Sequence, residues 1–161
     1  MSDFVKIPLS KGRFATIDAS DWERVKGWKW CLNYQGYVHA HVPGTKAKRV
    51  SLHRLVMGCQ PGDGIVVDHR NGDRLDNSRG NLRLCTKTEN GRNSKKRSGT
   101  KFPYKGVGDA KEGKYRMMFG MSGFATPEDA ARQWDLIAKF VYGEFARLNF
   151  PEIKAKLEMA S

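Results

Sequence analysis

The sequence contains no long hydrophobic run. No stretch reaches the roughly 18 consecutive apolar residues that a membrane-spanning helix requires, and the N-terminal MSDFVKIPLSKG lacks the apolar core of a signal peptide. The sequence therefore gives no sign of a membrane or secreted protein, and we expect a cytoplasmic location.

Cysteine is scarce as well. Cys31, Cys59 and Cys85 are odd in number and form no C-x-x-C pair, so the sequence supports neither a disulfide framework nor a thiolate zinc site. We expect all three to be small buried hydrophobic residues or unreactive thiols.

Acidic residues are outnumbered by basic ones. The 161 residues include 29 Lys and Arg but only 17 Asp and Glu, which gives a formal net charge of +12. Such an excess favours a polyanionic partner, with nucleic acid ahead of an anionic membrane surface. The length allows one domain or two small ones.

Residues 1–50 are predicted to be rich in β-structure. Short runs such as GRFATI and GYVHAHV alternate apolar and polar residues between Gly, Asp and Pro. ASDWERVKGWKW is predicted to hold one short helical turn, with Asp18 or Ser20 as its cap. His39 and His41 share one face of a predicted strand with no acid or cysteine beside them, so we expect them to be solvated rather than metal ligands.

Residues 51–97 show a β-β-α pattern. SLHRLVM is predicted to be a short helix that ends at Gly58, and GIVV a buried strand that leads into Asp68. After a loop rich in Gly, Asp and Asn, NLRLCT alternates as a second strand. KTENGRNSKK, with Thr86 as its cap, is predicted to be an exposed helix packed on this hairpin.

A basic linker, residues 98–103, is predicted next. The stretch SKKRSGTKFP contains four positive residues and no acid, with Gly and Pro as helix breakers. Its positive side chains either contact the backbone of a polyanion or are simply exposed to solvent. Lys95, Lys96 and Arg97 are the candidate nucleic-acid contacts at its start.

Residues 104–151 are predicted to form a small antiparallel sheet packed on one helix, followed by a tail, residues 152–161. YKGVGDAKEGKYRMMFG contains two strand-like runs separated by turn residues. The helix is predicted to begin at Pro127 behind a Thr126 cap and to stop at Gly143. Its buried face is predicted to consist of Ala130, Ala131, Trp134, Ile137, Ala138 and Val141. The whole chain is thus predicted to be of the α+β class.

Asp68 and His69 are the residues to which chemistry can be assigned. Hydrolysis of a phosphodiester needs a base that activates water and a cation that neutralises charge on the phosphate. An imidazole with an ordinary pKa near ~6.5 is largely neutral at cellular pH and can accept a proton. Because adjacent side chains of an extended segment point to opposite sides, the two groups can serve different atoms. We predict that Asp68 binds a metal ion and that His69 activates water.

The residues that follow this pair are spaced as in the motif of a known family. Asp68 and His69, then Asn81 twelve residues on and Asn90 nine further, stand in a strand-loop-strand-helix arrangement. This pattern resembles the HNH endonucleases of the ββα-metal (His-Me finger) class, in particular the homing enzymes encoded by phages and introns. LHRLVMG upstream and DNSRGNLRLCTKTEN downstream extend the resemblance.

The resemblance implies a role for each of these residues. His69 would be the general base, Asp68 and Asn90 would coordinate one divalent ion, and Asn81 would orient the loop and the imidazole. Many members have His where this chain has Asn90, and a neutral oxygen ligand there suits Mg²⁺, or Mn²⁺, over zinc. Asn93 would replace Asn90 as a ligand if the helix register differs.

The C-terminal region has a resemblance of its own. YKGV, GKY, TPEDAARQWD and ARLNFP are similar to the plant ethylene-response-factor (APETALA-type) DNA-binding domain, in which a three-stranded sheet enters the major groove in front of one helix. Phage homing endonucleases are known to carry this module. KYRMMFGMSGF is several residues shorter than two full strands and their turn. Lys105, Lys114 and Arg116 are expected on or beside the exposed sheet face, with contacts mostly to phosphates.

The predicted function is a metal-dependent endonuclease that hydrolyses phosphodiester bonds of double-stranded DNA, of the phage homing type and acting in the host cytoplasm. The alternatives are a DNA-binding regulator with an inactive nuclease fold and an RNA-binding or structural phage protein. The complete set of Asp68, His69, Asn81 and Asn90 favours the enzyme over the regulator. With one ββα unit, we expect a monomer or weak dimer that nicks DNA, without a membrane partner or a small-molecule cofactor.

Overall fold

The computed structural model describes residues 3–42, 49–96 and 98–152. Arg97 and all but the first residue of the predicted tail lie outside these ranges. The chain forms two compact units, Met1–Asn90 and Gly91–Ser161, and each is described by itself. Both combine helices with short antiparallel strands, so the predicted mixed α+β class is confirmed. No helix in the described ranges is long and apolar enough to cross a membrane.

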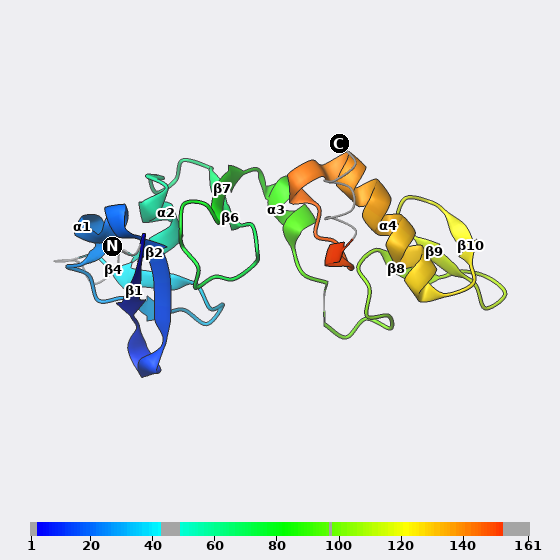
Figure 1. The fold of residues 1–161 in the computed structure, drawn as a ribbon, viewed down its shortest axis with the longest axis horizontal. Helices are drawn as coiled ribbons and strands as arrows, with labels where there is room; N and C mark the ends of the chain where they lie inside the picture. The colour runs from blue at the N-terminus through cyan, green and yellow to red at the C-terminus, as the bar shows by residue number, and fades with distance from the viewer. Residues whose placement is uncertain (1–2, 43–48, 97, 153–161) are drawn as a thin grey trace. The chain divides into compact units, whose positions relative to one another are not determined.

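The first half of unit 1 is rich in strands, as predicted (Figure 1). Strands β1 (Phe4–Pro8) and β2 (Phe14–Asp18) pair antiparallel, and β3 (Cys31–Leu32), β4 (Val38–His41) and β5 (Arg49–Ser51) form a second antiparallel sheet with β4 in the centre. The 3-10 turn η1 (Ser10–Gly12) connects β1 to β2, and the 3-10 turn η2 (Ala19–Asp21) and the short helix α1 (Trp22–Val25) follow β2 in the chain before β3.

Two expectations for this region are wrong. Neither Asp18 nor Ser20 caps the helical turn, since no side-chain hydrogen bond caps η2 or α1 in the described residues, and the carboxylate of Asp18 accepts a hydrogen bond from the Arg79 backbone N–H at 2.6 Å. His39 is buried rather than solvated, because β4 is the central strand and its first three residues are all buried.

The second half of unit 1 has the predicted β-β-α order. Its elements are α2 (Leu52–Val56), β6 (Val66–His69), β7 (Leu82–Cys85) and α3 (Lys87–Asn93), which continues into unit 2. Thr86 caps α3, as predicted. Its hydroxyl accepts from the Glu89 N–H at 3.2 Å, and the Glu89 carboxylate accepts from the Thr86 N–H at 2.8 Å, which satisfies two unpaired donors of the first turn.

One core holds unit 1 together. Its buried apolar residues come from both sides of position 50: Ile7, Leu9, Ala15, Ile17, Val25, Trp30, Val38, Ala40, Leu52, Val56, Val67 and Leu82. The hairpin β6–β7 therefore packs its Val67 and Leu82 face on the N-terminal strands.

Unit 2 is a three-stranded antiparallel sheet with a helix alongside it (Figure 1). Strands β8 (Val107–Asp109), β9 (Tyr115–Met117) and β10 (Ser122–Phe124) pair in the order β10-β9-β8, followed by α4 (Pro127–Tyr142) and the 3-10 turn η3 (Gly143–Phe145). The short KYRMMFGMSGF stretch supplies two strands because each has only three residues and the register shifts between Ser122 and Phe124. The predicted bounds of α4 and its Thr126 cap are confirmed.

Trp134 is the centre of the unit 2 core. It packs with Met117 and Ala138, and its indole lies against Gly106, where a Cβ atom would come within 2.1 Å of Nε1. Gly106 also has a φ of +79°, so only glycine fits this position. Val141 was predicted on the buried face but is 50% exposed, since in the last turn of α4 Tyr142 takes the place against the core.

Asp135 is a buried carboxylate that the helix pattern does not predict. It is fully buried and accepts hydrogen bonds from the backbone N–H groups of Asn149 at 2.9 Å and Phe150 at 2.8 Å. The Asn149 side chain bonds both backbone groups of Lys105. Asp135 and Asn149 therefore tie the ARLNFP segment to α4 and to the YKGV segment.

Candidate active site

The register of the hairpin β6–β7 places Asp68 and His69 on different faces. Asp68 is paired with Arg83, and His69 with Leu82. The His69 side is the face that carries the core residues Val67 and Leu82, whereas the Asp68 side carries Arg83 and Cys85.

Asp68 forms a buried ion pair. The Nε and Nη2 atoms of Arg83 both donate to Oδ2 of Asp68, at 3.0 and 2.7 Å, and the two side chains are only 5% and 8% exposed. A buried carboxylate requires such compensation. Asp68 is thus held as a charged oxygen donor at a fixed place on the hairpin.

His69 is buried at the end of β6, where its Nε2 atom lies 3.3 Å from Oδ1 of Asn77. Burial lowers the pKa of His69 from its ordinary value of 6.5, although the hydrogen bond to Asn77 and the nearby carboxylates oppose this effect. Because the pKa is lowered, the imidazole is neutral at cellular pH, which is the state that a general base requires.

Two aromatic rings surround the imidazole. The ring of His53 meets it edge-on with centroids 5.3 Å apart, and the ring of Tyr37 lies 6.0 Å away. The guanidinium of Arg74 covers Tyr37 at 4.3 Å. His53 is buried, and with Tyr37 it packs directly on the candidate base.

The stability of unit 1 should depend on pH through His53. Burial, together with the charges of His69 and Arg54, lowers the pKa of His53 from 6.5 to about 3. Below pH 6.5, His53 is therefore protonated in the unfolded chain but stays neutral in the folded chain. The free energy of unfolding therefore falls as the pH decreases from 6.5 toward 3. We expect the unfolding free energy at pH 5 to be roughly 2 kcal/mol below its value at pH 8 from this group alone.

Denaturant unfolding of wild type and His53→Phe at the two pH values measures this effect. The phenylalanine variant should lose less stability on acidification, and His41→Ala, which removes an exposed histidine of β4, should behave as wild type. An equal pH dependence for wild type and His53→Phe would contradict the prediction.

Asn81 bonds the backbone of the loop between β6 and β7. Its Oδ1 accepts from the Asn71 N–H at 3.0 Å, and its Nδ2 donates to the Asp76 carbonyl at 2.7 Å. The first bond joins the two ends of the loop, and the second holds its middle. The expected contact between an asparagine and the imidazole is made by Asn77, which sequence reasoning did not select.

The N-terminal strands also hold this loop. The Thr16 N–H donates to the Leu75 carbonyl and the Asn77 N–H donates to the Thr16 carbonyl, both at 2.8 Å. Arg79 binds the buried carboxylate of Asp21 through Nε at 2.8 Å and Nη2 at 2.7 Å. The region before residue 50 therefore supports the loop between β6 and β7, a role that the sequence left open.

Asn90 lies in the first turns of α3, where its backbone N–H donates to the Thr86 carbonyl at 3.0 Å. The helix follows directly after β7, whose Arg83 and Cys85 share the hairpin face of Asp68. Asn93, the alternative ligand, is buried at the last residue of α3.

One carboxylate and one amide oxygen are a small donor set for a metal ion. In the described ranges, no group of three or more His, Cys, Asp or Glu side chains is placed to hold one. A carboxylate with an amide oxygen is a donor set that suits Mg²⁺, which keeps several waters and takes further oxygen ligands from a phosphate substrate. By its chemistry, this donor set fits a hard cation and does not fit a structural zinc site.

The predicted basic contacts differ in their surroundings. Lys95, Lys114 and Arg116 are exposed and Lys96 is half-buried. Lys105 is half-buried, and burial lowers its pKa. Its ammonium donates to the carbonyls of Arg92 at 2.5 Å and Ser94 at 2.9 Å, so it is hydrogen-bonded within unit 2.

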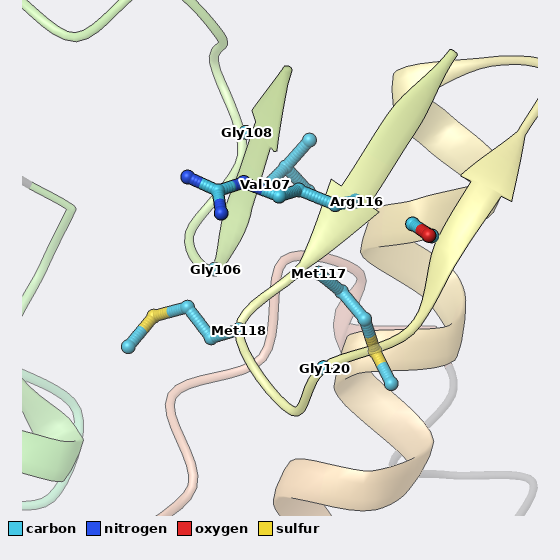
Figure 2. A pocket seen from close by; sticks show the side chains of 8 residues that line it. Gly106, Val107, Gly108, Arg116, Met117, Met118 and Gly120 are labelled. Atoms are coloured by element: carbon cyan, nitrogen blue, oxygen red, sulfur yellow. The ribbon is translucent and has the colours of Figure 1, made fainter. Parts of the chain in front are cut away.

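Arg116 lies on the face of the sheet opposite α4. Figure 2 shows its side chain extending from β9 across β8 at Gly108, in a pocket that also includes Val107 and Met118. A Cβ atom at Gly108 would come within 3.3 Å of the Arg116 side chain. The absence of a side chain at position 108 therefore gives Arg116 room on this face.

Residues 50–92 match the family model described as HNH endonuclease. An uncharacterized HNH endonuclease of Acanthamoeba polyphaga mimivirus is 33% identical over 158 residues, which cover 91% of this chain and 80% of the viral protein. The chain belongs to the HNH endonuclease family. No solved structure matches it.

As an HNH endonuclease, the protein is an enzyme, which confirms that prediction. The matched segment contains Asp68, His69, Asn81 and Asn90. HNH nuclease domains imply DNA as the substrate and generally use a divalent metal ion. The match also includes Asn77, whereas β1 and β2, which hold the loop, precede it.

Proposed function

We propose that this HNH endonuclease hydrolyses phosphodiester bonds of double-stranded DNA with His69 as general base and one divalent ion, Mg²⁺ or Mn²⁺, held by Asp68 and Asn90. The observation that carries the proposal is the hairpin register, which places the buried imidazole of His69 and the Asp68 carboxylate, paired with Arg83, on adjacent residues and opposite faces. The lowered pKa of His69 agrees with a neutral base. The resemblance to phage homing enzymes and the viral relative support a homing-type role in a viral genome.

Each of these residues has a separate role in the proposed hydrolysis. His69 takes a proton from water as the water oxygen attacks phosphorus, and the bond from phosphorus to the leaving oxygen breaks. Asn81 keeps the loop in shape around the imidazole. A divalent ion on Asp68 and Asn90 would neutralise negative charge on the phosphate and the leaving oxygen. One ββα unit contains one such site, so a monomer nicks one strand.

A plasmid-nicking assay with Mg²⁺, Mn²⁺ and EDTA tests the proposal. Supercoiled DNA should become open-circular with either metal and remain intact with EDTA. Asn90→Ala should be partly restored by more metal, because it loses a neutral oxygen ligand and keeps Asp68. No metal-dependent nicking by wild type would contradict the proposal, and loss of activity in Asn93→Ala but not Asn90→Ala would move the ligand to Asn93.

Unit 2 is proposed to be an APETALA-type DNA-binding module that lays its sheet in the major groove. Its support is the three-stranded antiparallel sheet backed by one helix, with exposed Lys114 and Arg116 on or beside the sheet. Lys95, Lys96 and Arg97 are proposed to contact phosphates next to it. Lys105 is proposed to stabilise unit 2 instead, since its ammonium bonds two backbone carbonyls.

Replacement of both Lys114 and Arg116 by alanine should weaken DNA binding and its salt dependence. Each lost phosphate contact should lower the slope of log affinity against log salt by up to about 0.9. Binding to duplex DNA is measured over a series of salt concentrations. Lys139→Ala, on α4 behind the sheet, is the control and should keep the wild-type slope. An unchanged slope in the double variant would show that this face does not bind DNA.

A further inference from the structure

Asn77 has an amide whose orientation is determined by its surroundings. The side chain is fully buried, and its Nδ2 donates to the backbone carbonyl of Arg74 at 3.1 Å. A carbonyl oxygen only accepts, so the atom facing it must be the NH₂ group. The other amide atom, Oδ1, therefore faces Nε2 of His69 at 3.3 Å.

This orientation decides which ring nitrogen of His69 carries hydrogen. Oδ1 has no hydrogen to donate, so a hydrogen bond at this place requires Nε2 to be the donor. A neutral imidazole has one N–H, and its lone pair is then on Nδ1. We propose that Asn77 is a positioning residue that fixes His69 in the Nε2–H tautomer and makes Nδ1 the nitrogen that accepts the proton from water. The proposal rests on the role of His69 as the base.

The neighbours of Asn77 make this a rigid arrangement. Its backbone N–H is held by the Thr16 carbonyl at 2.8 Å. On the imidazole itself, the rings of Tyr37 and His53 pack at 6.0 and 5.3 Å, which opposes rotation of the ring. The opposite tautomer would place a hydrogen on the nitrogen that must accept a proton, and would set an N lone pair against Oδ1.

Nitrogen NMR of the full chain, labelled at histidine and free of metal, reads the tautomer directly. At pH about 8, above the ordinary histidine pKa, the ring is neutral. We expect His69 to show a protonated Nε2 and an unprotonated Nδ1. A protonated Nδ1 would overturn the proposal. This measurement needs no activity, so its result is independent of whether His69 proves to be the base.

Two substitutions of Asn77 separate the effect of its hydrogen-bond acceptor from the effect of its bulk. Asn77→Leu keeps similar bulk but removes the acceptor, and should mix the two tautomers and lower kcat by about 10–100-fold with KM unchanged. Asn77→Asp keeps an acceptor for Nε2 but cannot donate to the Arg74 carbonyl. The new carboxylate should raise the pKa of His69, but at pH about 9 the imidazole is still mostly neutral. At that pH, Asn77→Asp should keep the Nε2–H tautomer and most of kcat.

Asn71→Ala is the control for general damage to the loop. It removes the side-chain bonds to Asp73 at 2.7 Å and to Asp76 at 3.1 Å and should leave the His69 tautomer unchanged. If Asn77→Leu keeps the wild-type tautomer and kcat, or if Asn77→Asp loses the Nε2–H tautomer as Asn77→Leu does, Asn77 does not determine the tautomer and the proposal is overturned.

Discussion

His69→Ala should slow DNA cleavage by roughly 10²–10⁴-fold while DNA affinity stays close to that of wild type. The substitution removes the only imidazole that lies beside Asp68 in the chain, which is the proposed acceptor of the proton of water. Affinity should persist because the proposed DNA contacts come from basic residues elsewhere. Single-turnover nicking and a binding assay with metal omitted measure the two quantities separately.

His41→Ala is the matched control for this substitution. It removes another histidine, exposed at the end of β4, and should leave both rate and affinity unchanged. Cleavage by His69→Ala at nearly the wild-type rate would show that another group activates water. A parallel loss of DNA affinity would instead show that the substitution disturbs the surface that binds DNA.

The local elements around the site could be predicted because their signals are local. The strands β6 and β7 follow from the apolar run before Asp68 and the alternation after Asn81, and α3 from the cap at Thr86. The helix α4 combines a cap, a proline at its first position and a glycine stop within one stretch of sequence. In each case the residues that determine the element lie next to it in the chain.

The support of the site could not be predicted because it depends on residues far apart in sequence. Asp21 and Arg79 are 58 positions apart, and nothing in either neighbourhood marks the other as its partner. Asn77 is one of several asparagines in a polar loop, and only its burial and its contact with the imidazole distinguish it. The Arg83 partner of Asp68 is visible only once the strand register is known.

These contacts change the interpretation of the N-terminal region. The sequence allowed it either to support the nuclease or to extend the DNA contact. Thr16, which bonds the loop, Asp21, which pairs with Arg79, and Tyr37, whose ring lies beside His69, all come from the region before residue 50. The hairpin β6–β7 and the N-terminal strands therefore form one structural unit.

Asp68→Asn should abolish cleavage at any ordinary Mg²⁺ concentration. The substitution removes the only charged protein ligand proposed for the metal, and a neutral amide holds a divalent ion far less strongly. It also leaves Arg83 without its carboxylate, a loss that costs about 3–5 kcal/mol when the pair is buried. Loss of activity alone would therefore not distinguish a metal ligand from a structural ion pair.

Arg83→Met is the variant that separates the two roles. It breaks the same ion pair but keeps the Asp68 carboxylate, which is then buried without its cationic partner. If Asp68 binds metal, this variant should still cleave DNA, and Mg²⁺ should raise its melting temperature more than that of wild type, because the ion compensates the buried charge. Asp68→Asn should show neither cleavage nor a metal-dependent melting temperature. If Arg83→Met is as inactive as Asp68→Asn and its melting temperature does not respond to Mg²⁺, Asp68 serves the ion pair and the metal ligand must be sought elsewhere.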